Sequence, residues 1–263
     1  METLYNYLND NNILVGDQYG FREKLSTETA IYTLLNNVLS SFDRRNLVGG
    51  SFCNLQKVFD YVNHEMFWAK IKFYGISGID NKLMESYSEN GYQRVSVNNY
   101  KLNKLFSNWV HLNHGVPQGL VLSHLLFLIY INDLSLSLNK LANSILFADD
   151  RTIIISNTNP EEFKNNINSV MTEITNWFRS NLLTLNCNKT YFRQFVTKKQ
   201  NERKIQIIAP NSINTNLNST KFLGLIIDNS LSWRDHIAAL ASKLNKACYA
   251  IRSIKPFFVC GCI

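Results

Sequence analysis

The sequence predicts an α+β fold in which an antiparallel sheet is backed by helices. Two apolar segments, 144–147 and 152–155, flank Ala148-Asp149-Asp150-Arg151, a pattern typical of a β-hairpin. Residues 159–177 carry one apolar stripe at helical spacing. Strands are joined by hairpins and do not alternate regularly with helices, so a sheet with helices on one face fits better than a doubly wound fold.

The first clear element along the chain is a helix that begins near Ser26. Its apolar residues recur at helical spacing, at Ala30, Leu34 and Val38. An apolar strand follows at about 47–55. The chain therefore places a helix and a strand before the hairpin.

The later elements follow the same reasoning. Asn159 and Pro160 are a capping residue and a proline at the first helical position, so they mark the start of the helix that ends near Trp177. A strand pair is expected around 222–228. The segment from Trp233 to Ile251 predicts an amphipathic basic helix.

Composition and charge favour a nucleic-acid partner. The chain has 263 residues, a net charge of +7 and a pI of about 9.1. Such a positive field attracts polyanions, although charge alone also fits a basic protein without that role. No Ser/His/Asp arrangement or phosphate-binding glycine loop is present, which excludes the hydrolase and nucleotide-switch classes.

Cysteines and apolar runs indicate an intracellular protein that is neither secreted nor inserted in a membrane. The five cysteines have no metal-ligand spacing and are expected to be reduced. The N-terminus lacks the features of a signal peptide, and the longest apolar run, 125–131, is far below membrane-spanning length. Nucleus and cytoplasm are not distinguished.

Asp149 and Asp150 are adjacent at the tip of the predicted hairpin. Neighbouring carboxylates between buried strands repel each other unless a cation or a basic side chain neutralises them. A divalent metal ion would do so, but acidic residues also occur at turns without a function. The pair alone leaves both interpretations open.

Six segments in order carry a resemblance to a known family. They are Gln18-Tyr19-Gly20-Phe21-Arg22, Lys57 to His64, Gly115-Val116-Pro117-Gln118-Gly119, Tyr130 to Leu134, Phe147-Ala148-Asp149-Asp150 and Phe222-Leu223-Gly224. Together they resemble LINE and jockey-like reverse transcriptases of non-LTR retrotransposons, over about residues 14–255. The resemblance implies a right-hand polymerase of fingers, palm and thumb. It also implies DNA synthesis from deoxynucleoside triphosphates on an RNA template with a DNA primer.

In that family the palm binds two Mg²⁺ ions that activate the primer 3′ hydroxyl and stabilise the pyrophosphate leaving group. The resemblance assigns metal binding to Asp149, with Asp150 beside it. The other metal-binding aspartate begins a D-L-x-K-A-F-D segment, and Asn54 stands at its position here. A neutral amide is a poor substitute for a bridging carboxylate, so we expect a degenerate, catalytically impaired copy.

The resemblance also implies residues that hold the substrates. Arg22 would meet the triphosphate, and Phe59 would lie beneath the incoming sugar and exclude a 2′ hydroxyl. Gln118 and Gly119 would contact nucleotide and template, although the usual S-V-L-G-P continuation reads Leu-Val-Leu-Ser-His here. Lys189 is a candidate to protonate the departing pyrophosphate.

Phe222, Leu223 and Gly224 match the hairpin that grips the primer end, and the basic helix from Trp233 would begin the thumb. The expected division is 1–47 fingers, 48–65 first part of the palm, 66–113 connection between fingers and palm, 114–228 palm, and 229–263 start of the thumb. Fingers and thumb are both expected to be truncated.

The differences between this chain and the family pattern leave three hypotheses open. The chain is a working polymerase, a non-catalytic RNA- and DNA-binding remnant, or a decayed transposon copy without a function.

Overall fold

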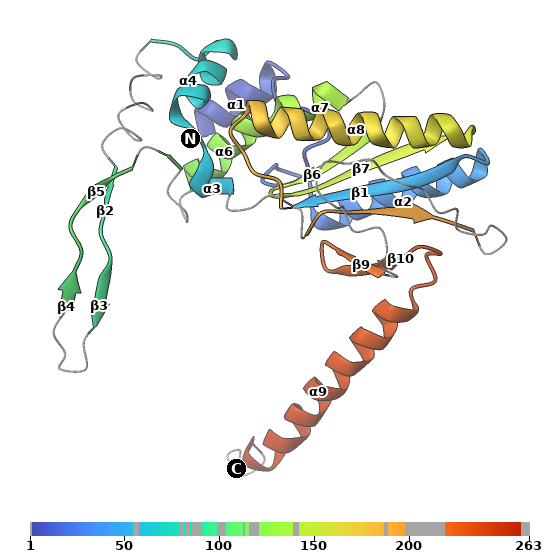
Figure 1. Ribbon diagram of the computed structural model, residues 1–263. Coiled ribbons are helices and arrows are strands. Elements are labelled where there is room, and N and C mark those ends of the chain that lie inside the picture. Colours follow the sequence, from blue (N-terminus) through green and yellow to red (C-terminus); the bar gives the residue numbers. More distant parts are fainter. Residues whose placement is uncertain are drawn as a thin grey trace.

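Four apolar segments form the central sheet of the computed structural model (Figure 1). The structure describes residues 2–54, 58–78, 82, 85, 91–98, 104–112, 114–115, 121–138, 142–186, 189–197 and 219–258. The strands lie in the order β6 (Asn143–Phe147), β7 (Asp150–Asn157), β1 (Leu47–Asn54) and β8 (Tyr191–Phe195), and neighbours are antiparallel. Alternate residues point to opposite faces, and both faces carry buried apolar side chains.

One large apolar cluster covers the first face and extends beyond it. Its helices are α1 (Glu2–Asp10), α4 (His64–Phe73), α6 (Val121–Ile131), α7 (Asp133–Leu138) and α8 (Pro160–Ser180). As predicted, α8 is capped by Asn159, whose side-chain oxygen accepts from the Glu161 N–H at 2.9 Å. The buried stripe of α8 faces the sheet, whereas α6 is buried at every residue from Leu125 to Ile131 and lies deeper in the core.

A polar cluster ties the N-terminal segment to these helices. Asn132 accepts a hydrogen bond from the Val15 N–H at 2.9 Å and donates one to the Ile13 carbonyl at 2.7 Å. The next residue, Asp133, pairs with Lys70 at 2.7 Å. Burial lowers the pKa of Lys70, and Asp133 opposes that shift. The segment Tyr130 to Leu134 therefore has a structural role in this chain.

A second, smaller cluster covers the opposite face. It contains α2 (Thr27–Asp43), which begins with a capping box between Ser26 and Thr29, and the hairpin of β9 (Ser219–Phe222) and β10 (Leu225–Asp228). The expectation of helices on one face was therefore wrong. The apolar stripe of α2 packs on the face of the sheet that carries the even-numbered residues of β1, such as Phe52. The stripe of α8 packs on the face that carries the odd-numbered residues, such as Cys53.

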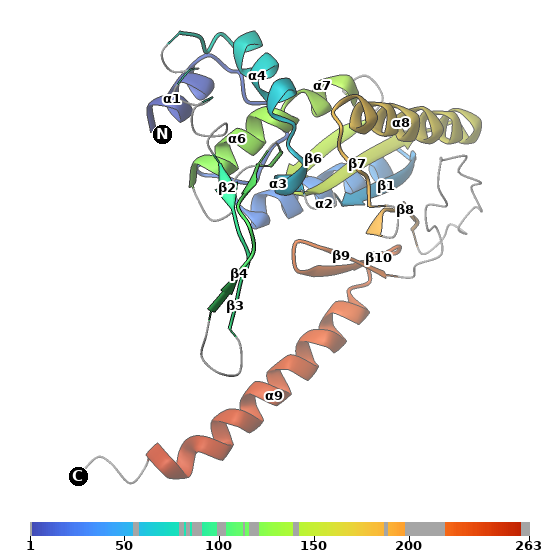
Figure 2. The same ribbon diagram turned by 60° about the vertical axis from the view of Figure 1, so that its left-hand side comes forward.

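Two elements project from this body on the same side of the sheet, in both views (Figures 1 and 2). One is the helix α9 (Arg234–Phe258). The other, here called the arm, is formed by the described residues 91–98 and 104–112. In it β2 (Tyr92–Gln93) pairs with β5 (Val110–His111), and β3 (Ser96–Asn98) pairs with β4 (Lys104–Phe106).

A short helix, α3 (Val58–Tyr61), follows β1. No helix in the described ranges is long and apolar enough to cross a membrane.

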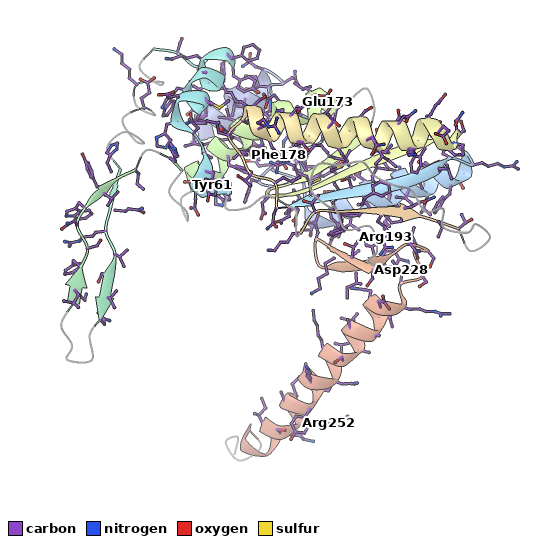
Figure 3. The ribbon with its side chains drawn as sticks, viewed as in Figure 1. Tyr61, Glu173, Phe178, Arg193, Asp228 and Arg252 are labelled. Carbon is purple, nitrogen blue, oxygen red and sulfur yellow. The ribbon has the colours of Figure 1, made fainter. Side chains whose placement is uncertain are left out.

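Asp228 fixes the connection between β10 and α9 (Figure 3). Its carboxylate accepts from the backbone N–H groups of Ser230, Ser232 and Trp233, each at 2.9 Å. Burial raises the pKa of Asp228, but these bonds and the serine hydroxyls outweigh it and hold the pKa at about 2. The start of α9 is therefore anchored by a carboxylate that must stay ionised.

Candidate active site

The acidic pair lies at the tip of the β6–β7 hairpin. Phe147 pairs with Asp150, so Ala148 and Asp149 form the connecting turn. Asp149 is exposed and Asp150 is half-buried. Ala148 has φ 53°, a left-handed conformation that costs a residue with a Cβ roughly 1–2 kcal/mol. The turn is held in this shape by its surroundings.

Residues 17–20 brace the turn from the free edge of β6. The Tyr19 N–H donates to the Leu146 carbonyl at 2.7 Å, and the Leu146 N–H donates to the Asp17 carbonyl at 2.8 Å. A Cβ on Gly20 would lie 2.5 Å from the Ala148 nitrogen, so only glycine fits against the turn. The Gln18-Tyr19-Gly20 motif thus positions the acidic pair.

Asn54 lies directly beside Asp150. It ends β1, where it is the register partner of Asp150 in β7. The Asn54 Nδ2 donates a hydrogen bond to the Asp150 Oδ1 at 3.1 Å. The resemblance connected Asn54 with Asp149, and the structure places Asn54 beside the second aspartate of the turn, Asp150, to which it presents an amide donor in place of a carboxylate.

Charges around Asp150 act in opposite directions. Burial raises its pKa, the Asn54 hydrogen bond lowers it, and Asp149 raises it further. Arg151 and Lys189 lower the pKa by their positive charges. A pocket beside the turn is lined by Phe52, Cys53, Asn54, Asp150, Arg151, Thr152, Lys189, Tyr191, Lys221 and Phe222.

The β9–β10 hairpin forms one wall of this pocket. Its turn residues Leu223 and Gly224 have φ of 45° and 92°, as in the two-residue turns typical of hairpins. The buried Phe222 ring packs against Phe52 with centroids 6.1 Å apart, and Phe52 stacks on Tyr191 at 5.2 Å. These rings attach the predicted primer grip to β1, which carries Asn54.

Arg22 and Phe59 have defined structural contacts. The Arg22 guanidinium donates to the Val15 carbonyl at 2.8 Å and to Asn9 Oδ1 at 3.2 Å. The half-buried Phe59 ring lies 4.9 Å from the Phe127 ring, centroid to centroid. Their nucleotide-binding roles stay predictions, and Gln118 and Gly119 lie outside the described residues.

The family model for reverse transcriptase (RNA-dependent DNA polymerase) matches residues 2–227. The chain belongs to this family. It is 26% identical over 249 residues to a probable RNA-directed DNA polymerase from transposon BS of Drosophila melanogaster, covering 90% of the chain and 26% of the relative. It is 24% identical over 229 residues to the RNA-directed DNA polymerase from mobile element jockey of Drosophila funebris, covering 85% and 24%. The resemblance to LINE and jockey-like reverse transcriptases is thus confirmed, and the chain spans about a quarter of the length of these relatives.

Solved telomerase structures share the fold of this reverse transcriptase domain. The apo telomerase of Candida tropicalis truncated from the C-terminal domain matches with a TM-score of 0.57 and 15% identity, covering 88% of this chain and 43% of that one. The telomerase of Candida albicans in complex with a TWJ fragment of telomeric RNA matches with a TM-score of 0.56 and 11% identity, covering 88% and 36%. The predicted right-hand polymerase fold is confirmed.

The donor set of this reverse transcriptase domain does not fit a pair of metal ions. Enzymes of the family use divalent metal ions. Among the described residues, however, no group of three His, Cys, Asp or Glu side chains is placed to hold one. Asp149 and Asp150 supply two carboxylates, and the third position presents the Asn54 amide nitrogen to Asp150. Hard divalent cations require oxygen ligands, preferably charged ones.

Arg151, which no motif in the sequence marked as part of the site, follows the acidic pair directly and is buried. It is 1% exposed, and in the described part of the chain its three guanidinium nitrogens have no hydrogen-bond partner. The Arg151 Cζ lies 5.6 Å from the centroid of the Phe178 ring. Burial lowers the pKa of Arg151 to about 10, and burial raises the pKa of the facing Cys53 to about 11. The feature of the sequence that could have indicated this role is a charged arginine in a strand whose next residues include three consecutive isoleucines.

Proposed function

We propose that this chain is the reverse transcriptase domain of a non-LTR retrotransposon that keeps the nucleic-acid-binding architecture but is impaired in DNA synthesis. The observation that carries the proposal is the hydrogen bond from Asn54 Nδ2 to Asp150 Oδ1. It occupies one carboxylate oxygen with an amide donor, at the position where the family has a metal-binding aspartate.

The chemistry of an amide explains the impairment. Asparagine offers one neutral oxygen acceptor, whereas an aspartate offers two oxygens and a negative charge. In the present orientation the nitrogen of Asn54, and not its oxygen, faces Asp150. If the lost metal organisation weakens transition-state binding by about 4 kcal/mol, the rate falls roughly a thousandfold.

Charge balance supports the same conclusion. Asp149 and Asp150 carry two negative charges, and the positive charges of Arg151 and Lys189 oppose that of Asp150. A site built around two metal ions needs excess negative charge to attract them. Asp149 and Asp150 are the ligands that remain for Mg²⁺, and they act without a third carboxylate.

RNA template and DNA primer are the proposed partners, and deoxynucleoside triphosphates are the proposed substrates. The net charge of +7 favours a polyanion. The cations of α9 lie on a helix that is exposed over most of its described length, and they are suited to contact phosphates: Arg234, Lys243, Lys246, Arg252 and Lys255. Lys221 in the β9–β10 hairpin lines the pocket beside Asp150.

The experiment is primer extension on an RNA template in Mg²⁺, with Asn54→Asp and Asp149→Ala as the compared variants. We expect little synthesis by the unaltered chain, a gain with Asn54→Asp and none with Asp149→Ala. Robust synthesis by the unaltered chain that Asp149→Ala abolishes would contradict the impairment.

Nucleic-acid binding is tested separately by measuring the affinity for an RNA–DNA hybrid against salt. Several phosphate contacts predict at least about a hundredfold loss between about 50 mM and about 200 mM salt. A flat salt dependence, or no binding, would reject the nucleic-acid-binding part of the proposal and leave a fold without that role.

A further inference from the structure

The arm has no core of its own. All described residues of its four strands are exposed, and the arm extends away from the sheet in both views (Figures 1 and 2). A two-stranded hairpin is marginally stable in water unless its side chains pack against each other or against a partner. The side chains of the arm should therefore show which kind of partner it fits.

The two faces of the arm differ in chemistry. The register pairs Tyr92 with His111 and Ser96 with Phe106, so alternate residues divide between the faces. The face here called the aromatic face carries Tyr92, Arg94, Phe106, Trp109 and His111. The other, here called the aliphatic face, carries Val95, Val97, Leu105 and Val110.

Contacts between rings and a cation organise the aromatic face. The Arg94 guanidinium carbon lies 4.1 Å from the Phe106 ring centroid and 4.6 Å from that of Trp109. The Tyr92 and His111 rings meet edge to face at 5.1 Å. These contacts hold the side chains in place, yet Tyr92, Phe106 and Trp109 remain 59%, 50% and 60% exposed. Ring surface is thus available to a ligand without rearrangement.

The charge of the arm is of one sign. Residues 91–112 contain Arg94, Lys101 and Lys104 and no aspartate or glutamate. Lys104 lies two residues before Phe106 in the same strand, so it belongs to the aromatic face. A partner that is negatively charged and offers flat rings for stacking complements this face best.

We propose that the aromatic face of the arm binds single-stranded nucleic acid. Bases stack on Trp109 and Tyr92, and phosphates lie against Arg94 and Lys104, the combination typical of proteins that bind single strands without sequence preference. The arm extends to the same side of the sheet as the β9–β10 hairpin and α9, so a strand that leaves the hybrid on this side can reach it (Figure 2). The inference rests on the proposed function, because it assigns the arm to the unpaired part of the template.

The test compares a blunt RNA–DNA hybrid with the same hybrid carrying a single-stranded overhang of about eight nucleotides, as RNA or as DNA. The variants are Trp109→Ala, Trp109→Phe and, as the matched control on the aliphatic face, Val97→Thr. We expect Trp109→Ala to weaken binding of either overhang hybrid roughly tenfold and to leave the blunt hybrid unchanged. Trp109→Phe keeps an aromatic surface and should stay within about threefold of the unaltered chain.

Each alternative outcome overturns the inference. Equal affinity of Trp109→Ala and the unaltered chain for the overhang hybrids excludes the arm as the site. An equal loss in Trp109→Phe excludes stacking, and an equal loss on the blunt hybrid shows that the variant acts on the duplex or on folding. A matching loss in Val97→Thr places the contact on the aliphatic face. If neither hybrid binds the unaltered chain, the proposed function fails first.

Discussion

Replacing Asn54 by aspartate should make the stability of the protein depend on Mg²⁺. The Asn54 Nδ2 lies 3.1 Å from the Asp150 Oδ1, so Asn54→Asp exchanges a hydrogen bond for a contact between two carboxylates. Two unit charges about 4 Å apart interact with about 4 kcal/mol at an effective dielectric constant of about 20. Protonation of one carboxylate limits the cost, which we place at about 2–4 kcal/mol. That corresponds to about 5–15 °C in the melting temperature.

Thermal unfolding in a chelator and in Mg²⁺ measures this effect. Mg²⁺ at about a hundred times its dissociation constant would raise the free energy of unfolding of Asn54→Asp by about 2.7 kcal/mol. The stability of the unaltered chain should change far less. Asn143→Asp is the matched control, because it adds the same charge at an exposed position of the same sheet. Equal stabilisation of the unaltered chain and Asn54→Asp by Mg²⁺ would refute the reasoning.

Three further predictions concern stability, each measured by urea unfolding. Arg151→Met should raise the free energy of unfolding by about 1–4 kcal/mol, because it removes a buried cation without hydrogen bonds, and a loss would show that Arg151 is paired. Gly20→Ala should lower the free energy of unfolding by about 1–3 kcal/mol, because its Cβ would collide with the backbone of the acidic turn. Gly16→Ala, which has open space around its Cβ, should leave the free energy of unfolding unchanged. Equal effects of the two substitutions would contradict the role of Gly20 in supporting the turn. Asp228→Asn should cost about 1–2 kcal/mol at neutral pH. The depressed pKa of Asp228 contributes stability that is complete above the unfolded value of about 4 and lost as pH falls through about 2, so this difference should vanish there, and a pH-independent difference would contradict the ionised anchor.

Local patterns in the sequence predicted the elements that carry the site. Asn159 and Pro160 marked the start of α8 because capping is a property of neighbouring residues. The acidic hairpin was visible because two buried strands leave two apolar runs around one turn. The resemblance connected Asn54 with the acidic turn, and the register of β1 against β7 places Asn54 directly beside Asp150.

Features that depend on distant partners were not predictable. The side chain of Arg22 contacts Val15 and Asn9, and no periodicity reports such a contact. The position of α2 opposite α8 depends on which face of β1 each helix meets, because both faces are apolar. The arm escaped notice because its strands bury neither face, so the alternation that identifies half-buried strands is missing.

The most direct test of the central claim is the single-turnover rate at which a bound RNA–DNA hybrid is extended by one deoxynucleotide in Mg²⁺, compared between Asn54→Asp and the unaltered chain. Single turnover separates the chemical step from binding and product release. If Asn54 is the cause of the impairment, the rate should rise by roughly a thousandfold in Asn54→Asp while the affinity for the hybrid stays the same. Equal rates in the two proteins, with Asp149→Ala inactive, would contradict the claim.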